Sequence, residues 1–220
     1  TGELLPDNII NATGQSVWAN DNKTLFYVSK DPETLRAATV MMHVLGTPSS
    51  EDKVVYNEDD ETFAVSLGKT KSKKYITIVS DQTLTTEVRL IDAANPAAGA
   101  KVFEPRKVDH LYSVEHLNGT FYIHTNADGA KNFKLMSCPE NKTGMANWKE
   151  VIPHRPDVLL ESFEVFDNYL VADERIKGLT NLRIISLADW SEHFLDFGEE
   201  TYTAGISVNP SANTTLLRYS

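Results

Sequence analysis

Leu25-Phe-Tyr-Val28 is the first of five similar runs of aromatic and aliphatic residues in this 220-residue sequence. The other four are Tyr75-Ile-Thr-Ile-Val79, Phe121-Tyr-Ile-His124, Tyr169-Leu-Val-Ala172 and Thr215-Leu-Leu-Arg218. The first residues of successive runs lie 50, 46, 48 and 46 positions apart. A period of this length indicates a repeat architecture, because each unit buries its apolar face against the next one.

The first four runs have the same neighbours, with one short apolar segment before each run and two after it. The preceding segments are Gln15–Ala19, Phe63–Leu67, Leu111–Glu115 and Phe163–Phe166; the third segments are Val40–Val44, Glu87–Ile91, Phe133–Met136 and Leu182–Ile185; the fourth are Lys53–Tyr56, Lys101–Phe103, Trp148–Ile152 and Glu192–Leu195. Segments of this length, rich in Val, Ile, Tyr and Phe and bounded by turn formers such as Asn118-Gly119, are typical of β-strands joined by hairpins.

Four strands in every repeat predict an all-β fold of the β-propeller type. We expect four complete four-stranded antiparallel blades, at about residues 15–56, 63–103, 111–152 and 158–197. The competing interpretation is a β-sandwich whose strands happen to be evenly spaced.

The two ends of the sequence predict partial blades. Glu3-Leu-Leu5 is interpreted as the last strand of an earlier blade, and only two strands, Gly205–Val208 and Thr215–Arg218, are expected after Thr201. We therefore expect residues 1–5 and 202–220 to belong to incomplete blades of one propeller domain, and the whole chain to be a piece of a larger propeller. Open blades expose unpaired strand edges, which predicts pairing with a second copy unless the edges are covered.

Composition excludes several classes of function. With 31 Asp and Glu against 21 Lys and Arg, the formal net charge is −10, which disfavours nucleic acid and anionic membranes as partners. No apolar run is long enough to span a bilayer, and no signal segment is recognised. The single Cys138 and six histidines without metal-ligand spacing predict neither a metal site nor a cofactor. Cysteine-poor usage favours a cytoplasmic location, with a periplasmic one as the alternative.

Catalytic motifs are missing. Gly14-Gln-Ser16 and Gly205-Ile-Ser207 resemble the start of a nucleophile elbow, but both lack the second glycine and both lie in predicted strands. Gly68-Lys-Thr70 ends like a phosphate-binding loop, but Phe63 stands where the first glycine of that motif belongs. Asp109 and His110 are adjacent on an extended segment, so their side chains are expected to point to opposite faces rather than to form a catalytic pair.

The strongest charge cluster is Glu58-Asp59-Asp60-Glu61, between a predicted fourth strand and the next first strand. Two interpretations remain open. The cluster is either a solvated turn or an acidic patch that attracts a basic ligand to one end of the propeller.

The blades resemble the propeller domain of the oligopeptidase B branch of the prolyl oligopeptidase family of serine peptidases. The resemblance covers nearly the whole chain and rests on the ordered stretches Val17-Trp-Ala-Asn-Asp21, His43-Val-Leu-Gly-Thr47, Thr86-Glu-Val-Arg-Leu-Ile-Asp92, Asp109-His-Leu-Tyr112, Gly129-Ala-Lys-Asn-Phe133, Ile152-Pro-His-Arg155, Val158-Leu-Leu-Glu161, Glu174-Arg175 and Gly178-Leu-Thr-Asn-Leu-Arg183. It implies a seven-bladed propeller that covers an α/β-hydrolase domain carrying the catalytic Ser, Asp and His. It also implies cleavage of short peptides after Lys or Arg.

The resemblance further implies which loops face the hydrolase domain, namely those joining strands two and three of a blade and those leading to the next blade. The candidate substrate-facing or interdomain residues on these loops are Glu58, Asp59, Asp60, Glu61, Asp109, His110, Lys131, Arg155, Glu174, Arg175 and Lys177. Arg175 is the candidate for contacting a substrate carbonyl or carboxylate, and an interdomain Arg–Glu salt bridge is its competing role.

Two functions follow from these observations. The first is a non-catalytic propeller that restricts a peptidase active site to short peptides, with the hydrolase domain and peptides containing Lys or Arg as its partners. The second is a stand-alone propeller that acts as a protein-interaction scaffold. Neither gives the chain peptidase activity by itself, because no hydrolase domain lies within these 220 residues.

Overall fold

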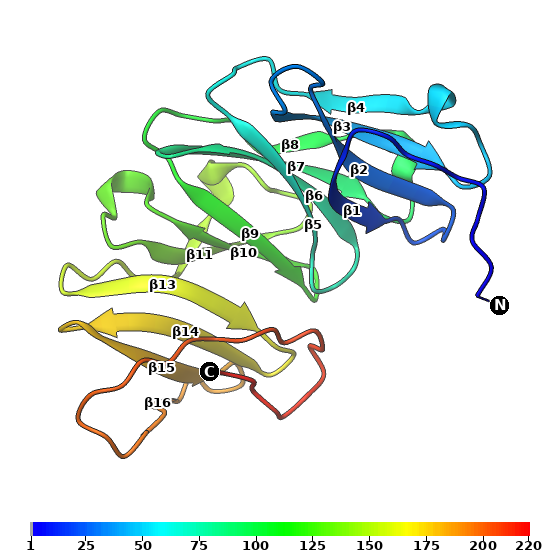
Figure 1. The fold of residues 1–220 in the computed structure, drawn as a ribbon. Coiled ribbons are helices and arrows are strands. Elements are labelled where there is room, and N and C mark those ends of the chain that lie inside the picture. The colour runs from blue at the N-terminus through cyan, green and yellow to red at the C-terminus, as the bar shows by residue number, and fades with distance from the viewer. Residues whose placement is uncertain (1) are drawn as a thin grey trace. The chain divides into compact units, whose positions relative to one another are not determined.

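A computed structural model describes residues 2–220. The described residues form sixteen strands and four short 3-10 helices, arranged as four antiparallel sheets of four strands each (Figure 1). The chain divides into two compact units, residues 1–109 and 110–220, and each contains two of the sheets. The predicted all-β class and the four four-stranded blades are confirmed.

The first unit holds two sheets in which sequential strands are neighbours. The strands are β1 (Ala12–Trp18), β2 (Thr24–Lys30), β3 (Ala37–Val44) and β4 (Lys53–Asn57) in one sheet, and β5 (Ala64–Lys69), β6 (Tyr75–Gln82), β7 (Thr85–Asp92) and β8 (Lys101–Glu104) in the other. The helices η1 (Ser49–Glu51) and η2 (Pro96–Ala98) lie in the loops before the two fourth strands.

The second unit repeats this plan. Its strands are β9 (Tyr112–Leu117), β10 (Thr120–Thr125), β11 (Lys134–Pro139) and β12 (Lys149–Ile152) in one sheet, and β13 (Val158–Val165), β14 (Tyr169–Ile176), β15 (Leu179–Ser186) and β16 (Glu192–Phe194) in the other. The helices η3 (Ala127–Gly129) and η4 (Met145–Asn147) lie in loops of the β9–β12 sheet.

Each unit has its own core between its two sheets. In the first unit, Phe26 and Val40 pack in one cluster with Ile76 and Ile78 of the neighbouring sheet. These residues lie on the second or third strand of their sheet. In these strands apolar residues follow one another with few polar residues between them, as expected for strands that are buried on both faces. In the second unit, the core joins side chains of β13, β14 and β15 with side chains of the β9–β12 sheet; it includes Leu135, Ile152, Leu160, Leu170 and Ala172.

Two-residue turns close the tightest hairpins. Asn118 and Gly119 have φ values of 49° and 76°, and Lys177 and Gly178 have φ values of 52° and 88°. Two successive positive φ values define the type I′ turn, which matches the twist of the strands that it joins. The predicted Asn118-Gly119 hairpin therefore forms because both residues tolerate positive φ values. Lys177 also has a positive φ value, which is strained for a residue with a long side chain.

Both predicted partial blades differ from the structure. Glu3–Leu5 is not a strand, and Leu4 is almost completely exposed. Gly205–Val208 and Thr215–Arg218 are not regular strands either; one bridge joins Ile206 to Tyr219.

The backbone pairing near the C-terminus is short because the Asn209 side chain, and not a second strand, binds the backbone of Arg218. The Asn209 amide nitrogen donates to the carbonyls of Ser207 and Arg218, and its Oδ1 accepts from the Arg218 backbone N–H. A side chain that satisfies the backbone groups locally removes the need for a continuing strand.

No helix in the described part of the chain is long and apolar enough to cross a membrane.

Candidate functional site at the crossover end

Strand alternation divides the loops of each sheet between two ends. In an antiparallel sheet of four sequential strands, the loop between strands two and three lies at the same end as the loop that leads to the next sheet. We call this the crossover end and the opposite one the hairpin end. The predicted site residues lie on crossover-end loops, or on the strand residues beside them.

Glu58 lies in the β4–β5 loop at the crossover end and is buried, with only 4% of its surface exposed. Its Oε2 accepts hydrogen bonds from the Tyr56 hydroxyl at 2.5 Å, from the Arg106 guanidinium at 2.5 Å and from the Ser80 hydroxyl. Its Oε1 accepts from the Asp60 backbone N–H at 3.1 Å. Both carboxylate oxygens are therefore engaged, and the charge of Glu58 is matched inside the protein instead of being displayed to solvent.

These contacts keep Glu58 ionised. Burial by itself raises the pKa of this carboxyl, but hydrogen bonds from Arg106, Ser80 and Tyr56 outweigh burial and hold its pKa at about 2. Glu58 also raises the pKa of Arg106 in return. A group that stays charged at every physiological pH and is almost completely buried fits a structural role.

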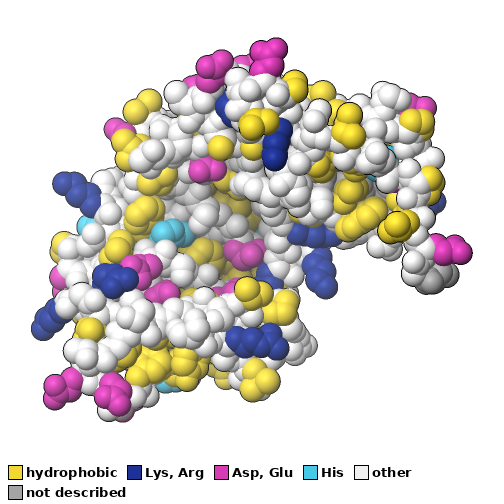
Figure 2. Space-filling view, in the orientation of Figure 1, with side chains coloured by type: hydrophobic (Ala, Val, Ile, Leu, Met, Phe, Trp, Pro, Cys, Tyr) yellow, Lys and Arg dark blue, Asp and Glu magenta, His cyan; other side chains and the backbone are white. Residues whose placement is uncertain are grey.

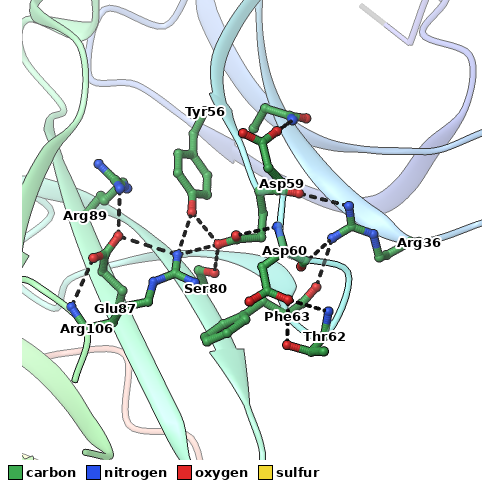
Figure 3. Close-up of polar contacts among 12 residues, drawn as sticks. Arg36, Tyr56, Asp59, Asp60, Thr62, Phe63, Ser80, Glu87, Arg89 and Arg106 are labelled. Carbon is green, nitrogen blue, oxygen red and sulfur yellow. Dashed lines mark hydrogen bonds and ion pairs between the residues drawn. The ribbon is translucent and has the colours of Figure 1, made fainter. Parts of the chain in front are cut away.

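Arg106 contacts several side chains of the first unit (Figure 3). Besides Glu58, its guanidinium contacts the Tyr56 hydroxyl at 3.2 Å and lies 3.8 Å from Glu87. It also stacks over the Phe63 ring, with 4.1 Å between the guanidinium carbon and the ring centroid. Arg89 completes the group by pairing with Glu87 at 2.6 Å, so that two cations balance two anions.

The remaining acidic residues of the run, Asp59, Asp60 and Glu61, are exposed. Acidic side chains stand out at the surface along the top of the view in Figure 2. Arg36 fixes the backbone of this turn by donating to the carbonyls of Glu58 at 2.9 Å, Asp60 at 3.0 Å and Phe63 at 3.2 Å. The turn therefore presents three carboxylates on a rigid support.

In the second unit, Glu174 on β14 is completely buried. Its Oε1 accepts from Arg155 in the β12–β13 loop and from two nitrogens of Arg183 on β15, at 3.1 Å for Nε and 2.5 Å for Nη2. The Glu174 Oε2 has no hydrogen-bond partner among the described residues. Arg183 also pairs with Glu192 at 2.6 Å, whereas the side chain of Arg155 is 32% exposed.

Arg175 is the most exposed arginine of this end, with 43% of its side chain exposed. Its Nε donates to Glu161 at 2.8 Å and its Nη1 to the Gly178 carbonyl at 3.2 Å. Lys177 is exposed at the adjoining hairpin turn. Arg175 and Glu174 are successive residues of one strand, so their side chains point to opposite faces of the sheet.

Of the remaining predicted residues, His110 is buried, whereas Asp109 and Lys131 are exposed to solvent. His110 is buried, contacts Thr125 at 3.0 Å and stacks on Tyr112 with ring centroids 5.1 Å apart. This packing fits a core position better than a contact with substrate. Asp109 and Lys131 are exposed on crossover-end loops.

The sequence did not single out Arg36 and Glu87, which hold the crossover-end loops of the first unit, or Arg183, which holds Glu174 in the second unit. Arg36 lies 22 residues from Glu58, whose carbonyl it binds, and Arg183 lies nine residues from Glu174. The repeat itself was the available signal, because Arg106 and Arg155 each follow the fourth strand of a blade within three residues.

The described residues contain no group of three or more His, Cys, Asp or Glu side chains placed to hold a metal ion. The crossover end instead offers carboxylates and guanidinium groups, which recognise charged and hydrogen-bonding parts of a partner. Its chemistry is that of binding and docking.

Known proteins are similar to this chain in sequence. Dipeptidyl aminopeptidase BI of Pseudoxanthomonas mexicana is 44% identical over 220 residues, which is all of this chain and 30% of that protein. Protease 2 of Moraxella lacunata is 29% identical over all of this chain and 31% of its own length. The present chain thus spans about a third of the length of these relatives.

Solved structures give the same result. Oligopeptidase B from Leishmania major matches 99% of this chain and 32% of its own, with a TM-score of 0.90 and 29% identity. Oligopeptidase B from Trypanosoma brucei, solved in a closed form with covalently bound antipain, matches 96% of this chain and 31% of its own, with a TM-score of 0.86 and 29% identity.

The family model of the prolyl oligopeptidase N-terminal β-propeller domain matches residues 1–220. The chain belongs to the prolyl oligopeptidase family and is β-propeller in fold.

Proposed function

We propose that this chain is part of the propeller of a longer serine peptidase, where it covers the active site and admits only short peptides. The observation that supports this most strongly is the close match to oligopeptidase B over nearly the whole chain but only a third of that enzyme. The chain contributes no nucleophile of its own, so its proposed role is to bind, exclude and position. A lid of this kind also removes bulk water from the site and strengthens electrostatic interactions there.

Arg155 is the proposed contact between the crossover end and the rest of the peptidase or its substrate. A guanidinium group has five N–H donors, and the contact of Arg155 with Glu174 uses only one side of it. Glu174 is itself fixed by Arg183, so it holds Arg155 in one orientation at the surface. The outward donors suit a carboxylate of the hydrolase domain or a carbonyl of a bound peptide.

The exposed turn Asp59–Glu61 is proposed to attract peptides that contain Lys or Arg. Its three carboxylates are held on a backbone clamped by Arg36, so the field they produce is fixed in direction. Attraction of this type acts mainly on the rate of encounter and weakens as salt increases. Glu58 is excluded from this role because Arg106 neutralises it.

A dipeptidyl aminopeptidase is the second candidate function, favoured by the 44% identity to a protein of that name. Such an enzyme must recognise the free α-ammonium group of its substrate, whereas an endopeptidase accepts a blocked N-terminus. The same exposed carboxylates suit an ammonium group as well as they suit a lysine or arginine side chain.

A peptidase assay tests these proposals. The substrates are Arg-Arg-p-nitroanilide with a free N-terminus and the same compound with a benzyloxycarbonyl block, and the proteins are the 220-residue chain and the longer protein that contains it. We expect cleavage by the longer protein only. Preference for the blocked substrate supports an oligopeptidase, and preference for the free one supports a dipeptidyl aminopeptidase. Failure of the folded longer protein to cleave either substrate contradicts both and favours the interaction scaffold.

A further inference from the structure

His43 lies at the end of β3, at the hairpin end of its sheet, and only 1% of its surface is exposed. Its Nδ1 lies 2.7 Å from Asp52 Oδ1 and its Nε2 lies 3.0 Å from Asp7 Oδ1. A buried imidazole is thus held between two carboxylates. Neither the candidate site nor the proposed peptidase function uses this group.

The geometry favours a ring that carries two protons. Ionised carboxylates only accept hydrogen bonds, so both ring nitrogens must donate, and an imidazole that donates from both nitrogens is the positively charged form. The three charges of Asp7, His43 and Asp52 belong to three separate segments of the first unit. The Tyr27 hydroxyl on β2 adds a fourth segment by donating to Asp52 Oδ2 at 2.9 Å.

Asp7 belongs to the strap, which we define as residues 2–11. The strap has no helix or strand of its own. Asp7 Oδ1 also accepts the Gly46 backbone N–H at 2.6 Å, and Pro6, Asp7 and Asn8 line one side of a groove whose other side includes Thr47 and Pro48. His43 and Gly46 are therefore the polar anchors that hold this part of the strap on the β3–β4 loop.

Loss of one proton from His43 breaks one of the two ring contacts. The Asp52 side chain is 1% exposed and is fixed by Tyr27, whereas the Asp7 side chain is 11% exposed and lies on an irregular segment. A neutral ring therefore keeps Nδ1–H on Asp52 and turns the lone pair of Nε2 toward the carboxylate of Asp7. Because two acceptors repel each other, Asp7 is the partner that moves away.

We propose that His43 is a proton-operated latch, which holds the strap on the β3–β4 loop while the ring is charged and releases the strap when the ring becomes neutral.

The direction of the pH dependence follows from the groups that face the ring, which are Asp7 from the strap and Asp52 from the segment before β4, with Tyr27 behind Asp52. Burial lowers the pKa of His43, but the hydrogen bonds and charges of Asp52 and Asp7 outweigh it and raise the pKa above the ordinary 6.5. The latch is therefore closed below pH 6.5 and opens as the pH rises through the higher folded-state value.

Asp7 sets the acid limit of the same latch. Hydrogen bonds from the Gly46 backbone and His43 lower the pKa of Asp7 below its ordinary 3.8. A lowered carboxyl pKa means that this contact is present above pH 3.8 and is lost as the pH falls further. The strap is consequently held between these two limits and free outside them.

Nuclear magnetic resonance of the 220-residue chain tests the proposal without any substitution. Ring ¹⁵N shifts of His43 should show two protonated nitrogens at pH 6. The protection factor of the Gly46 amide against hydrogen exchange should fall as the ring titrates, by about tenfold for each pKa unit by which folding shifts His43. A neutral ring at pH 6, or protection of Gly46 that stays constant while the ring titrates, would overturn the proposal.

Two variants and a control sharpen the test. Asp7→Asn keeps an acceptor oxygen but removes the charge, so the midpoint of His43 should move to lower pH. His43→Gln should leave Gly46 weakly protected at every pH between 6 and 9. His124→Gln is the control, because His124 is a buried histidine whose Nε2 contacts a backbone carbonyl, that of Leu160 at 2.7 Å, and whose pKa is lowered by burial. Loss of Gly46 protection in His124→Gln would assign the effect to general destabilisation and contradict the latch.

Discussion

Arg106 and Arg155 each lie in the loop that follows the fourth strand of a blade, two residues after β8 and three residues after β12, yet their surroundings differ. Arg106 contacts Glu58, Tyr56 and Glu87 and stacks on Phe63. Arg155 contacts Glu174, which also forms an ion pair with Arg183. The two arginines thus differ in the number of their partners: Arg106 contacts several side chains of its own unit and Arg155 contacts Glu174, while their side chains are similarly exposed, at 29% and 32%.

In a repeat fold, equivalent loops can therefore serve stability in one blade and recognition in another. Each blade needs the loop after its fourth strand to be anchored, and a buried glutamate with an arginine provides the anchor in both units. In the first unit, both oxygens of Glu58 are occupied, and Arg106 also contacts Tyr56 and stacks on Phe63. In the second unit, Arg183 contacts both Glu174 and Glu192, and we propose that Arg155, which contacts Glu174 through one nitrogen, also binds a group outside the unit.

The largest effect is expected for Arg106→Met. This substitution leaves Glu58 buried without its cation, and breaking a buried ion pair from one side costs about 3–5 kcal/mol of unfolding free energy. Urea unfolding of the 220-residue chain at pH 7 measures it. A loss below 1 kcal/mol would mean that Arg106 does not anchor the first unit.

The acid dependence of stability gives the next largest effect. The pKa of Glu58 is about 2 in the folded chain and ordinarily 4.5, so the stability that it contributes is present above pH 4.5 and is lost as the pH falls toward 2. Its size is on the order of 2–3 kcal/mol. Urea unfolding between pH 2.5 and 6 should show a shallower slope for Glu58→Gln, whereas the exposed Glu61→Gln should keep the slope of the unmodified chain.

Arg155→Met should cost less than Arg106→Met, about 1–2 kcal/mol, because one hydrogen bond to a charged group is lost while Arg183 continues to neutralise Glu174. The same urea titration compares the two variants. An equal loss of unfolding free energy in Arg155→Met and Arg106→Met would contradict the distinction between the two arginines.

The smallest effect concerns the exposed carboxylates. Glu61 lies at the crossover end and Glu51 at the hairpin end of the first unit, and both are exposed. Either substitution to Gln should change stability by less than about 0.5 kcal/mol. In the proposed longer peptidase, Glu61→Gln should reduce the dependence of kcat/KM on salt for Arg-containing peptides, and Glu51→Gln should not. Identical salt dependence in both variants would exclude attraction by the Asp59–Glu61 turn.

The blades were predictable because each one repeats its own apolar pattern. A strand such as β6 is recognisable from Tyr75-Ile-Thr-Ile-Val79 alone, and the spacing of such strands sets the repeat. The ends were predicted less well. Glu3–Leu5 has the composition of a strand but no pairing partner in the structure, and at Gly205–Val208 the Asn209 side chain replaces the ladder.

The candidate site was predictable as a set of loops but not as a set of contacts. Alternation alone places Glu58 and Arg155 at crossover ends. Whether a carboxylate is displayed or neutralised depends on residues far away in sequence, so Glu58 could not be separated from Asp59–Glu61 before Arg106 was seen beside it. The buried His43 latch was equally hidden, because Asp7 lies 36 residues before it.

The most direct test of the account compares Arg155→Met with Arg106→Met in the proposed longer peptidase, at a temperature where both variants are folded. We predict that kcat/KM for the preferred Arg-Arg substrate falls at least about tenfold in Arg155→Met, which corresponds to one lost charged contact. Arg155→Lys should recover part of it, and Arg106→Met should stay close to the unmodified enzyme. Unchanged kcat/KM in Arg155→Met, or an equal fall in both variants, would contradict the assignment of Arg155 to recognition and Arg106 to stability.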